Sequence, residues 1–158
     1  MHPVASAVYR LALALWVGGM SVFTFVVTPV IFRTQPRESA GKIVGLLFPH
    51  YFRFCLAVTA AAFVARAVAG EAVSGSRQLA GTFLIVLSLA IGSYHAFALA
   101  PRMEDVRKTV VSMETTPKED PVRREFSRLH GISMGLNLAV IVAGVILILG
   151  YDVLRRSP

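Results

Sequence analysis

Long stretches without any charged residue constrain the fold of this chain more than any other feature of its sequence. Residues 11–32 form a 22-residue run without Asp, Glu, Lys or Arg, and similar runs cover 79–100 and 131–151. At 1.5 Å per residue, about 20 helical residues cross the roughly 30 Å of hydrocarbon in a bilayer. Each of the three runs therefore predicts a membrane-crossing helix.

A fourth apolar stretch, 43–65, is interrupted by Pro49, His50 and Arg53. Only 54–65, 12 residues, is free of ionisable groups, and a run of that length is also typical of a buried helix in a soluble protein. Because three other stretches are predicted to cross the bilayer, we interpret 43–65 as a fourth crossing. Its polar residues are expected to be buried against the neighbouring helices.

The sequence thus predicts an all-α fold, an integral membrane four-helix bundle with both termini on the same side. We expect a single four-helix transmembrane domain, 1–158. Asp120 and Pro121 are typical of a helix N-cap followed by proline at the first helical position. The predicted helices cover about 8–33, 42–69, 78–101 and 121–151, with a cytoplasmic loop at 102–120.

The composition supports a membrane environment over a soluble nucleic-acid-binding domain. The chain has 16 Lys and Arg against 9 Asp and Glu, a net charge of +7. In a soluble protein this balance would suggest nucleic acid as a partner. Here 55% of residues are hydrophobic and 16% are charged, against about 25% charged in soluble domains. We expect a lipid bilayer as the partner, and no nucleic acid.

The distribution of basic residues predicts the orientation. Segments 33–42 and 101–128 hold ten Lys and Arg, and the opposite end of the bundle holds five. Because basic residues collect in cytoplasmic loops, both segments are expected in the cytoplasm and both termini outside. Arg155 and Arg156 oppose this assignment. We predict a multi-pass protein of the cell membrane, in a bacterial inner membrane.

Polar residues within the helices gather at the loop-rich end. His50 and Arg53 share a helix face, as do His95 and Arg102. The three histidines His50, His95 and His130 fall within roughly 10 Å of one membrane face, given 1.5 Å per residue. If these faces converge, the bundle has a polar, basic mouth at that end. The residues expected to bind solute there, or to join the helices, are Tyr51, Arg53, Arg102, His130, Ser133 and Asn137.

Three interpretations of the mouth stay open. The polar side chains can join helices by hydrogen bonds, which average about 0.6 kcal/mol each in membranes. His50, His95 and His130 are weak candidates for a metal or haem site, because neighbouring arginines repel cations. Alternatively, Arg53 and Arg102 suit an anion or a polar solute. No cofactor is predicted, although a haem or a metal ion is left open.

No catalytic signature is present in the helices. None of the four apolar stretches contains Asp or Glu, so a Ser-His-Asp set or a carboxylate proton relay inside the membrane is not available. Cys55 is the single cysteine, which rules out an internal disulfide and a CxxC pair. We therefore do not expect an enzyme.

Several motifs resemble one family of small membrane proteins. They are Phe32-Arg33, the stretch 47–52 (LFPHYF), Pro101-Arg102, and 126–138 (FSRLHGISMGLNL). In these the chain resembles the DUF4149 family, which includes animal transmembrane protein 205, associated with resistance to platinum drugs. The matching residues are Pro49, Tyr51, Pro101, Arg102, His130, Ser133 and Asn137. The resemblance implies a four-helix bundle that handles metals or metal–drug complexes. It also implies sulfur-mediated export of platinum, but the single cysteine of this chain does not supply the paired thiols that such a relay would use.

The leading prediction is a transporter-like or resistance-associated membrane protein. It would bind a polar solute or metal species at the loop-side mouth and form a homo-oligomer, because four helices leave little room for a pathway. One alternative is a membrane redox protein whose haem is ligated by histidines of different helices. Another is a non-catalytic assembly or scaffold subunit.

Overall fold

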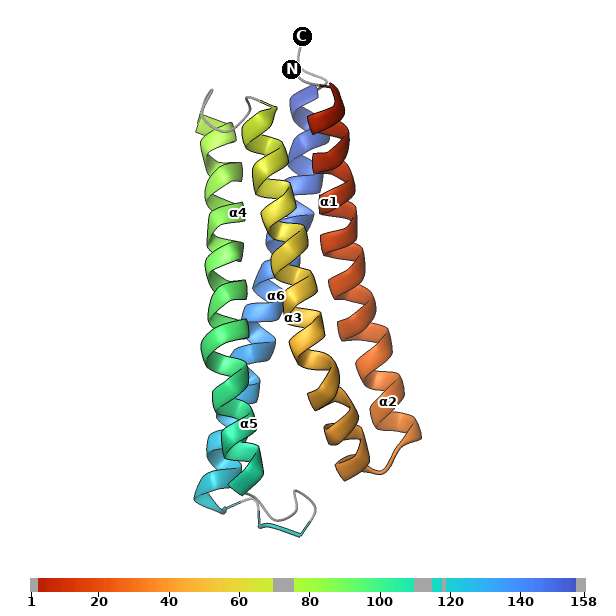
Figure 1. Cartoon of the computed structure of the whole chain (residues 1–158), viewed down its shortest axis with the longest axis vertical. Helices are drawn as coiled ribbons and strands as arrows, with labels where there is room; N and C mark the ends of the chain where they lie inside the picture. The colour runs from red at the N-terminus through yellow and green to blue at the C-terminus, as the bar shows by residue number, and fades with distance from the viewer. Residues whose placement is uncertain (1–2, 70–75, 110–114, 118, 156–158) are drawn as a thin grey trace.

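The computed structural model is a bundle of four long helical rods (Figure 1). It describes residues 3–69, 76–109, 115–117 and 119–155. Every regular element in these ranges is helical, and four helices are long and apolar enough to cross a membrane, which confirms the predicted fold class. The elements are α1 (Pro3–Val22), η1 (Phe23–Val27), α2 (Thr28–Thr34), α3 (Arg37–Val68), α4 (Ser76–Tyr94), η2 (His95–Leu99), α5 (Ala100–Thr109) and α6 (Pro121–Arg155).

The rods are arranged so that each contacts two neighbours. The α1 helix packs against α3 and α6, and α4 packs against the same two helices from the other side. Figure 1 shows that α1 begins and α6 ends at one end of the bundle, whereas α2 and α5 lie at the opposite end. We call this opposite end the loop side. That the loop side faces the cytoplasm stays a prediction.

Apolar side chains cover the outside of the bundle as well as its core. In α1, Tyr9, Trp16 and Met20 are buried, whereas Leu11 and Leu15 on the other face are exposed. A helix that is apolar all round is typical of a protein interior or of a membrane span. Because the outer face meets no other helix, a lipid environment accounts for its composition.

Two glycines allow the helices to approach closely. A Cβ atom at Gly19 of α1 would lie 2.6 Å from Phe54 Cε1 of α3. A Cβ atom at Gly144 of α6 would lie 2.6 Å from Val17 Cγ2 of α1. Small residues at contacts of this kind are the common means of packing helices in membranes, where no hydrophobic force drives association.

Two of the rods contain a widened, π-helical turn that the sequence analysis did not predict. The N–H of Thr28 bonds to the carbonyl of Phe23 in η1, and the N–H of Ala100 bonds to the carbonyl of His95 in η2. Each π segment ends two residues before a proline, Pro29 or Pro101. Because proline has no N–H and its ring crowds the preceding turn, a wider turn lets the helix continue past it.

The helices extend further at the loop side than the sequence predicted. The break between the first two rods is confined to Gln35 and Pro36, because α3 already begins at Arg37. Extended Pro36 sets the start of α3, and Lys42 pairs with Glu38 one turn away at 3.3 Å. Pairs at this spacing stabilise helices in water.

The expected loop 102–120 is corrected in the same way, because α5 is helical through Thr109. Arg107 pairs with Glu104 at 2.8 Å, and Met103 is buried against Leu129 of α6. Packing against α6 therefore holds this segment helical beyond the apolar run. Within the rest of that loop, residues 110–114 and 118 lie outside the described part of the chain.

The predicted start of α6 is confirmed in detail. The Asp120 carboxylate accepts hydrogen bonds from the N–H groups of Val122 and Arg123 at 2.9 and 3.1 Å. Pro121 occupies the first helical position, where its missing N–H has no consequence.

Candidate functional site

Polar residues gather in two separate places in this part of the structure. One group lies between the helices and consists of Thr24, Tyr51, His95, Ser133 and Asn137. We call it the interior polar cluster. The second place is the loop-side pocket, which is lined by Arg102, Arg124, Glu125, Arg128 and Leu129. The single mouth expected from the sequence is therefore divided into a buried part and an exposed part.

In the interior polar cluster, one asparagine joins three of the rods. The Tyr51 hydroxyl of α3 donates to Asn137 Oδ1 of α6 at 2.6 Å. Asn137 Nδ2 in turn donates to Thr24 Oγ1 of η1 at 2.9 Å. The Tyr51 ring also stacks on Phe23 at a centroid distance of 4.2 Å. Tyr51 and Asn137 therefore join helices, as one of the three interpretations expected.

His95 of η2 belongs to the same buried region. Only 3% of its surface is exposed, and its ring stacks on Phe52 of α3 at 4.9 Å with an 11° angle between the planes. The backbone of Ser133 on α6 lies beside the imidazole, and Ser133 is itself buried. The ring nitrogen Nε2 of His95 has no protein partner among the described residues.

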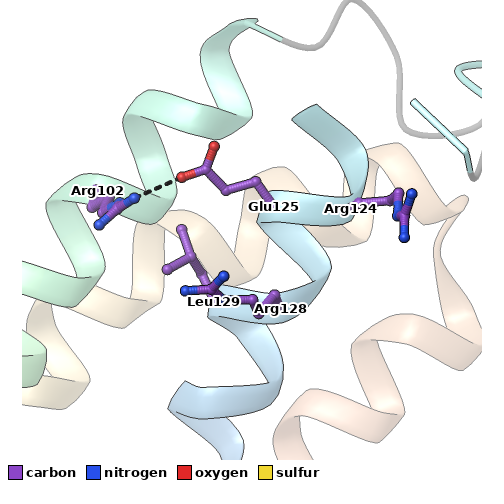
Figure 2. A pocket seen from close by; sticks show the side chains of 5 residues that line it. All are labelled: Arg102, Arg124, Glu125, Arg128 and Leu129. Carbon is purple, nitrogen blue, oxygen red and sulfur yellow. Dashed lines mark hydrogen bonds and ion pairs between the residues drawn. The ribbon is translucent and has the colours of Figure 1, made fainter. Parts of the chain in front are cut away.

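The loop-side pocket lies between α5 and the first turns of α6. Its volume is about 510 Å³, and three of its five lining side chains are arginines. Figure 2 shows Arg102 reaching from α5 toward Glu125 on α6, with Leu129 beneath them. Arg102 Nη2 lies 2.8 Å from Glu125 Oε1. Three guanidinium groups and one carboxylate give this pocket a positive balance.

The three histidines do not converge, which corrects the expected grouping. His130 is exposed and stacks on Phe126 at 6.1 Å, one turn away on α6. His50 and Arg53 are also exposed, whereas His95 is buried. Within the described ranges, no three His, Cys, Asp or Glu side chains lie close enough together to hold a metal ion.

A second buried polar site, not predicted from the sequence, lies at the end of the bundle opposite the loop side. Arg66 of α3 is only 4% exposed. Its guanidinium donates to Thr82 Oγ1 at 3.2 Å, to Tyr9 Oη at 3.2 Å and to the Gln78 carbonyl at 3.0 Å. Arg66 is one of the five basic residues that the sequence assigned to the end of the bundle opposite the loop-rich segments. Its position directly after the apolar run 54–65 was the available signal.

Three residues that line the loop-side pocket, Arg124, Glu125 and Arg128, were not predicted as site residues from the sequence. Their spacing within two turns of one helix places them near one another. Only the packing of α5 against α6 makes them the wall of a pocket with Arg102.

These features, four long apolar helices with polar side chains bonded between them, define a multi-pass helical membrane protein. Residues 11–112 match the family model described as "Domain of unknown function (DUF4149)". An "Uncharacterized protein" of Aquifex aeolicus (strain VF5) is 31% identical over 146 residues, which covers 89% of this chain and 95% of that protein. The chain belongs to the DUF4149 family. No solved structure matches it.

Proposed function

We propose that this protein is a transporter-like membrane protein that binds an anionic polar solute at the loop-side pocket. The observation that carries the proposal is the set of three arginines, Arg102, Arg124 and Arg128, around a cavity of about 510 Å³. The guanidinium group presents paired N–H donors that match the oxygens of phosphate or carboxylate. The pocket therefore has the charge and the donors for such an anion.

Of the two ligand classes considered from the sequence, the pocket favours the anion over a metal cation. Its one carboxylate, Glu125, is already paired with Arg102, and two further arginines remain in the lining. The pair is itself replaceable, because 64% of the Arg102 side chain and 44% of the Glu125 side chain are exposed. Exposed ion pairs of this kind contribute only about 0–1 kcal/mol to the stability of the fold. An incoming anion can thus take the place of Glu125 at Arg102.

The position of the pocket supports a link to the interior. The α5 helix continues directly from η2, which carries His95, and α6 carries both Arg128 and Asn137. A ligand that draws α5 and α6 together would act on two of the rods that contribute to the interior polar cluster. With the loop side in the cytoplasm, the pocket would receive cytoplasmic solutes. A wider role in resistance, like that associated with animal transmembrane protein 205, and homo-oligomerisation belong to the same proposal.

The haem alternative receives no support from the space around the buried histidine. The cavity beside His95 measures about 10 Å³, which is room for one water molecule and far too little for a porphyrin. The scaffold alternative has one specific observation in its favour, the bonds from Asn137 to Tyr51 and Thr24. These bonds suit a structural role for the interior and leave the pocket free to bind.

The test is equilibrium binding of inorganic phosphate, measured by calorimetry on the protein in nanodiscs of zwitterionic lipid. We expect saturable binding that Arg128→Gln weakens about tenfold, the effect of one lost charge-assisted hydrogen bond. Arg53→Gln, which removes an exposed arginine outside the pocket, is the matched control and should leave the affinity unchanged. Absence of binding, or equal losses in both variants, would overturn the proposal.

A further inference from the structure

A small cavity lies in the middle of the bundle, next to the interior polar cluster. Its volume is about 10 Å³, and its polar lining comes from α3, α4, η2 and α6 through Thr59, Ser88, His95 and Asn137. We infer that this cavity binds one water molecule, which bridges His95 and Asn137. A cavity of about this volume holds a single water when two to four polar groups face it.

The two hydroxyl groups at the cavity offer lone pairs and no protons. Thr59 Oγ1 donates its proton to the carbonyl of Cys55, one turn back in α3. Ser88 Oγ likewise donates to the carbonyl of Leu84 at 2.8 Å. A hydroxyl oxygen whose proton is committed can still accept. Both residues are almost fully buried, so only a molecule inside the cavity can use these acceptors.

His95 supplies a third acceptor. Its Nε2 atom is buried and has no protein partner among the described residues. In the neutral tautomer with the proton on Nδ1, Nε2 carries a free lone pair that can accept a hydrogen bond. A buried imidazole nitrogen without a hydrogen bond is unfavourable unless a ligand satisfies it.

Asn137 supplies the donor that decides between ligands. Its carboxamide nitrogen carries two N–H groups, and Thr24 accepts one of them. The second N–H needs an acceptor. Water can accept this bond while it donates to His95 Nε2 and to Ser88 or Thr59. Ammonium or a metal ion has no lone pair for Asn137, so neither matches the complete set.

The water would complete a chain of hydrogen bonds across the bundle, from His95 through Asn137 to Tyr51 and Thr24. Both π segments take part, because Thr24 lies in η1 and His95 lies in η2. Widened turns of this kind often occur where a helix must present a particular side chain. Both widened turns would thus present side chains to the same chain of hydrogen bonds.

The test combines two measurements on the parent protein in lipid bilayers. A high-resolution structure should show one water within about 3.2 Å of His95 Nε2, the upper limit of a hydrogen bond. Solid-state NMR on protein labelled with ¹⁵N-histidine should show an unprotonated Nε2 that receives polarisation from water protons. His95→Phe, which keeps an aromatic ring beside Phe52, identifies the signal.

A further variant tests whether the water that transfers polarisation to His95 lies in the cavity or at the protein surface. Ser88→Val fills the cavity with methyl groups and should reduce the transfer from water to His95 at least fivefold. Ser21→Val, a change in α1 outside the cavity lining, should leave it unchanged. If Ser88→Val does not fold, the parent measurements decide alone. A dry cavity, a protonated Nε2, or a density with the short contacts of a metal ion would overturn the inference.

Discussion

The hydroxyl group of Tyr51 and the carboxamide of Asn137, 86 positions apart in the sequence, meet at 2.6 Å between α3 and α6. Asn137 also holds Thr24, so one side chain connects three of the four rods. Hydrogen bonds between membrane helices average about 0.6 kcal/mol and reach about 1.7 kcal/mol. This arrangement identifies Asn137 as the residue on which the interior depends most.

Substitution of Asn137 should therefore cost more than substitution of Tyr51. We expect Tyr51→Phe to lower the free energy of unfolding by about 0.5–1.5 kcal/mol. Asn137→Leu leaves two buried partners unsatisfied and should cost about 1–3 kcal/mol. Reversible unfolding in mixed micelles measures both values. Tyr94→Phe, at an exposed tyrosine, is the control. Equal effects of Tyr51→Phe and Tyr94→Phe would contradict the role of the bond.

The buried Arg66 predicts an unusual sensitivity at one glycine. A Cβ atom at Gly81 would lie 2.8 Å from Arg66 Nη2, so Gly81→Ala must displace the guanidinium from its three acceptors. Elsewhere in a helix, Gly→Ala stabilises by about 1 kcal/mol. We expect Gly81→Ala to lower the melting temperature and Gly131→Ala, which meets no neighbour within 4 Å, to raise it.

A double variant tests whether the predicted loss of stability comes from the conflict between a Cβ atom at position 81 and the Arg66 guanidinium. In an Arg66→Ala background the clash disappears, so Gly81→Ala should become neutral or stabilising. Additive effects of the two substitutions would mean that Gly81 and Arg66 do not interact.

The π segments predict opposite effects at two prolines. Pro101→Ala restores a backbone N–H and therefore favours a regular α-helix at the wide turn. A regular helix has no room for the extra residue of the π turn. Its loss rotates one half of the rod by about 100° relative to the other half. Because His95 and Met103 are buried on either side of that turn, one of them must leave its site. We expect a lower melting temperature for Pro101→Ala.

Pro49 gives the matched comparison. It lies exposed inside α3, which is α-helical on both sides of it. Pro49→Ala should raise the melting temperature, because it adds a hydrogen bond and removes a steric conflict. Stabilisation by both substitutions would refute the link between Pro101 and the wide turn.

Glu125 is predicted to restrain the loop-side pocket. Glu125→Gln removes the carboxylate that occupies Arg102 and should tighten phosphate binding about threefold to tenfold, given the 0–1 kcal/mol typical of an exposed pair and the lost repulsion. Glu119→Gln changes the net charge equally at an exposed position outside the pocket lining. Unchanged or weaker binding to the Glu125→Gln protein would exclude this competition.

The sequence predicted the fold well because membrane helices are dictated by local composition. The uncharged run 11–32 and the cap at Asp120 each specify their element without reference to the rest of the chain. Helix length at the loop side was underestimated, since α5 is stabilised by Met103 packing on Leu129 beyond the apolar run. Contacts of that kind follow from tertiary structure and leave no periodic signal.

The candidate site was only partly predictable for a related reason. The sequence assigned His130 and Asn137 to the same helix, but it could not show that His130 is exposed while Asn137 meets Tyr51. The π turn at η2 lies between His95 and Arg102, so the regular-helix spacing that placed the two on one face does not apply there. The helix that carries each residue was therefore predictable, whereas the neighbours of its side chain were not.

The central claim is that α3, the crossing with the least apolar sequence, carries the chain through the bilayer. Ser39 lies in the first turn of α3 and Ser76 is the first residue of α4, and both are exposed. Cys55 is buried and should contribute little background. We propose to label Ser39→Cys and Ser76→Cys proteins in intact cells with a membrane-impermeant maleimide. The account predicts that the cysteine at 76 reacts from outside and the cysteine at 39 only after permeabilisation. Reaction of both cysteines from the same side would contradict it.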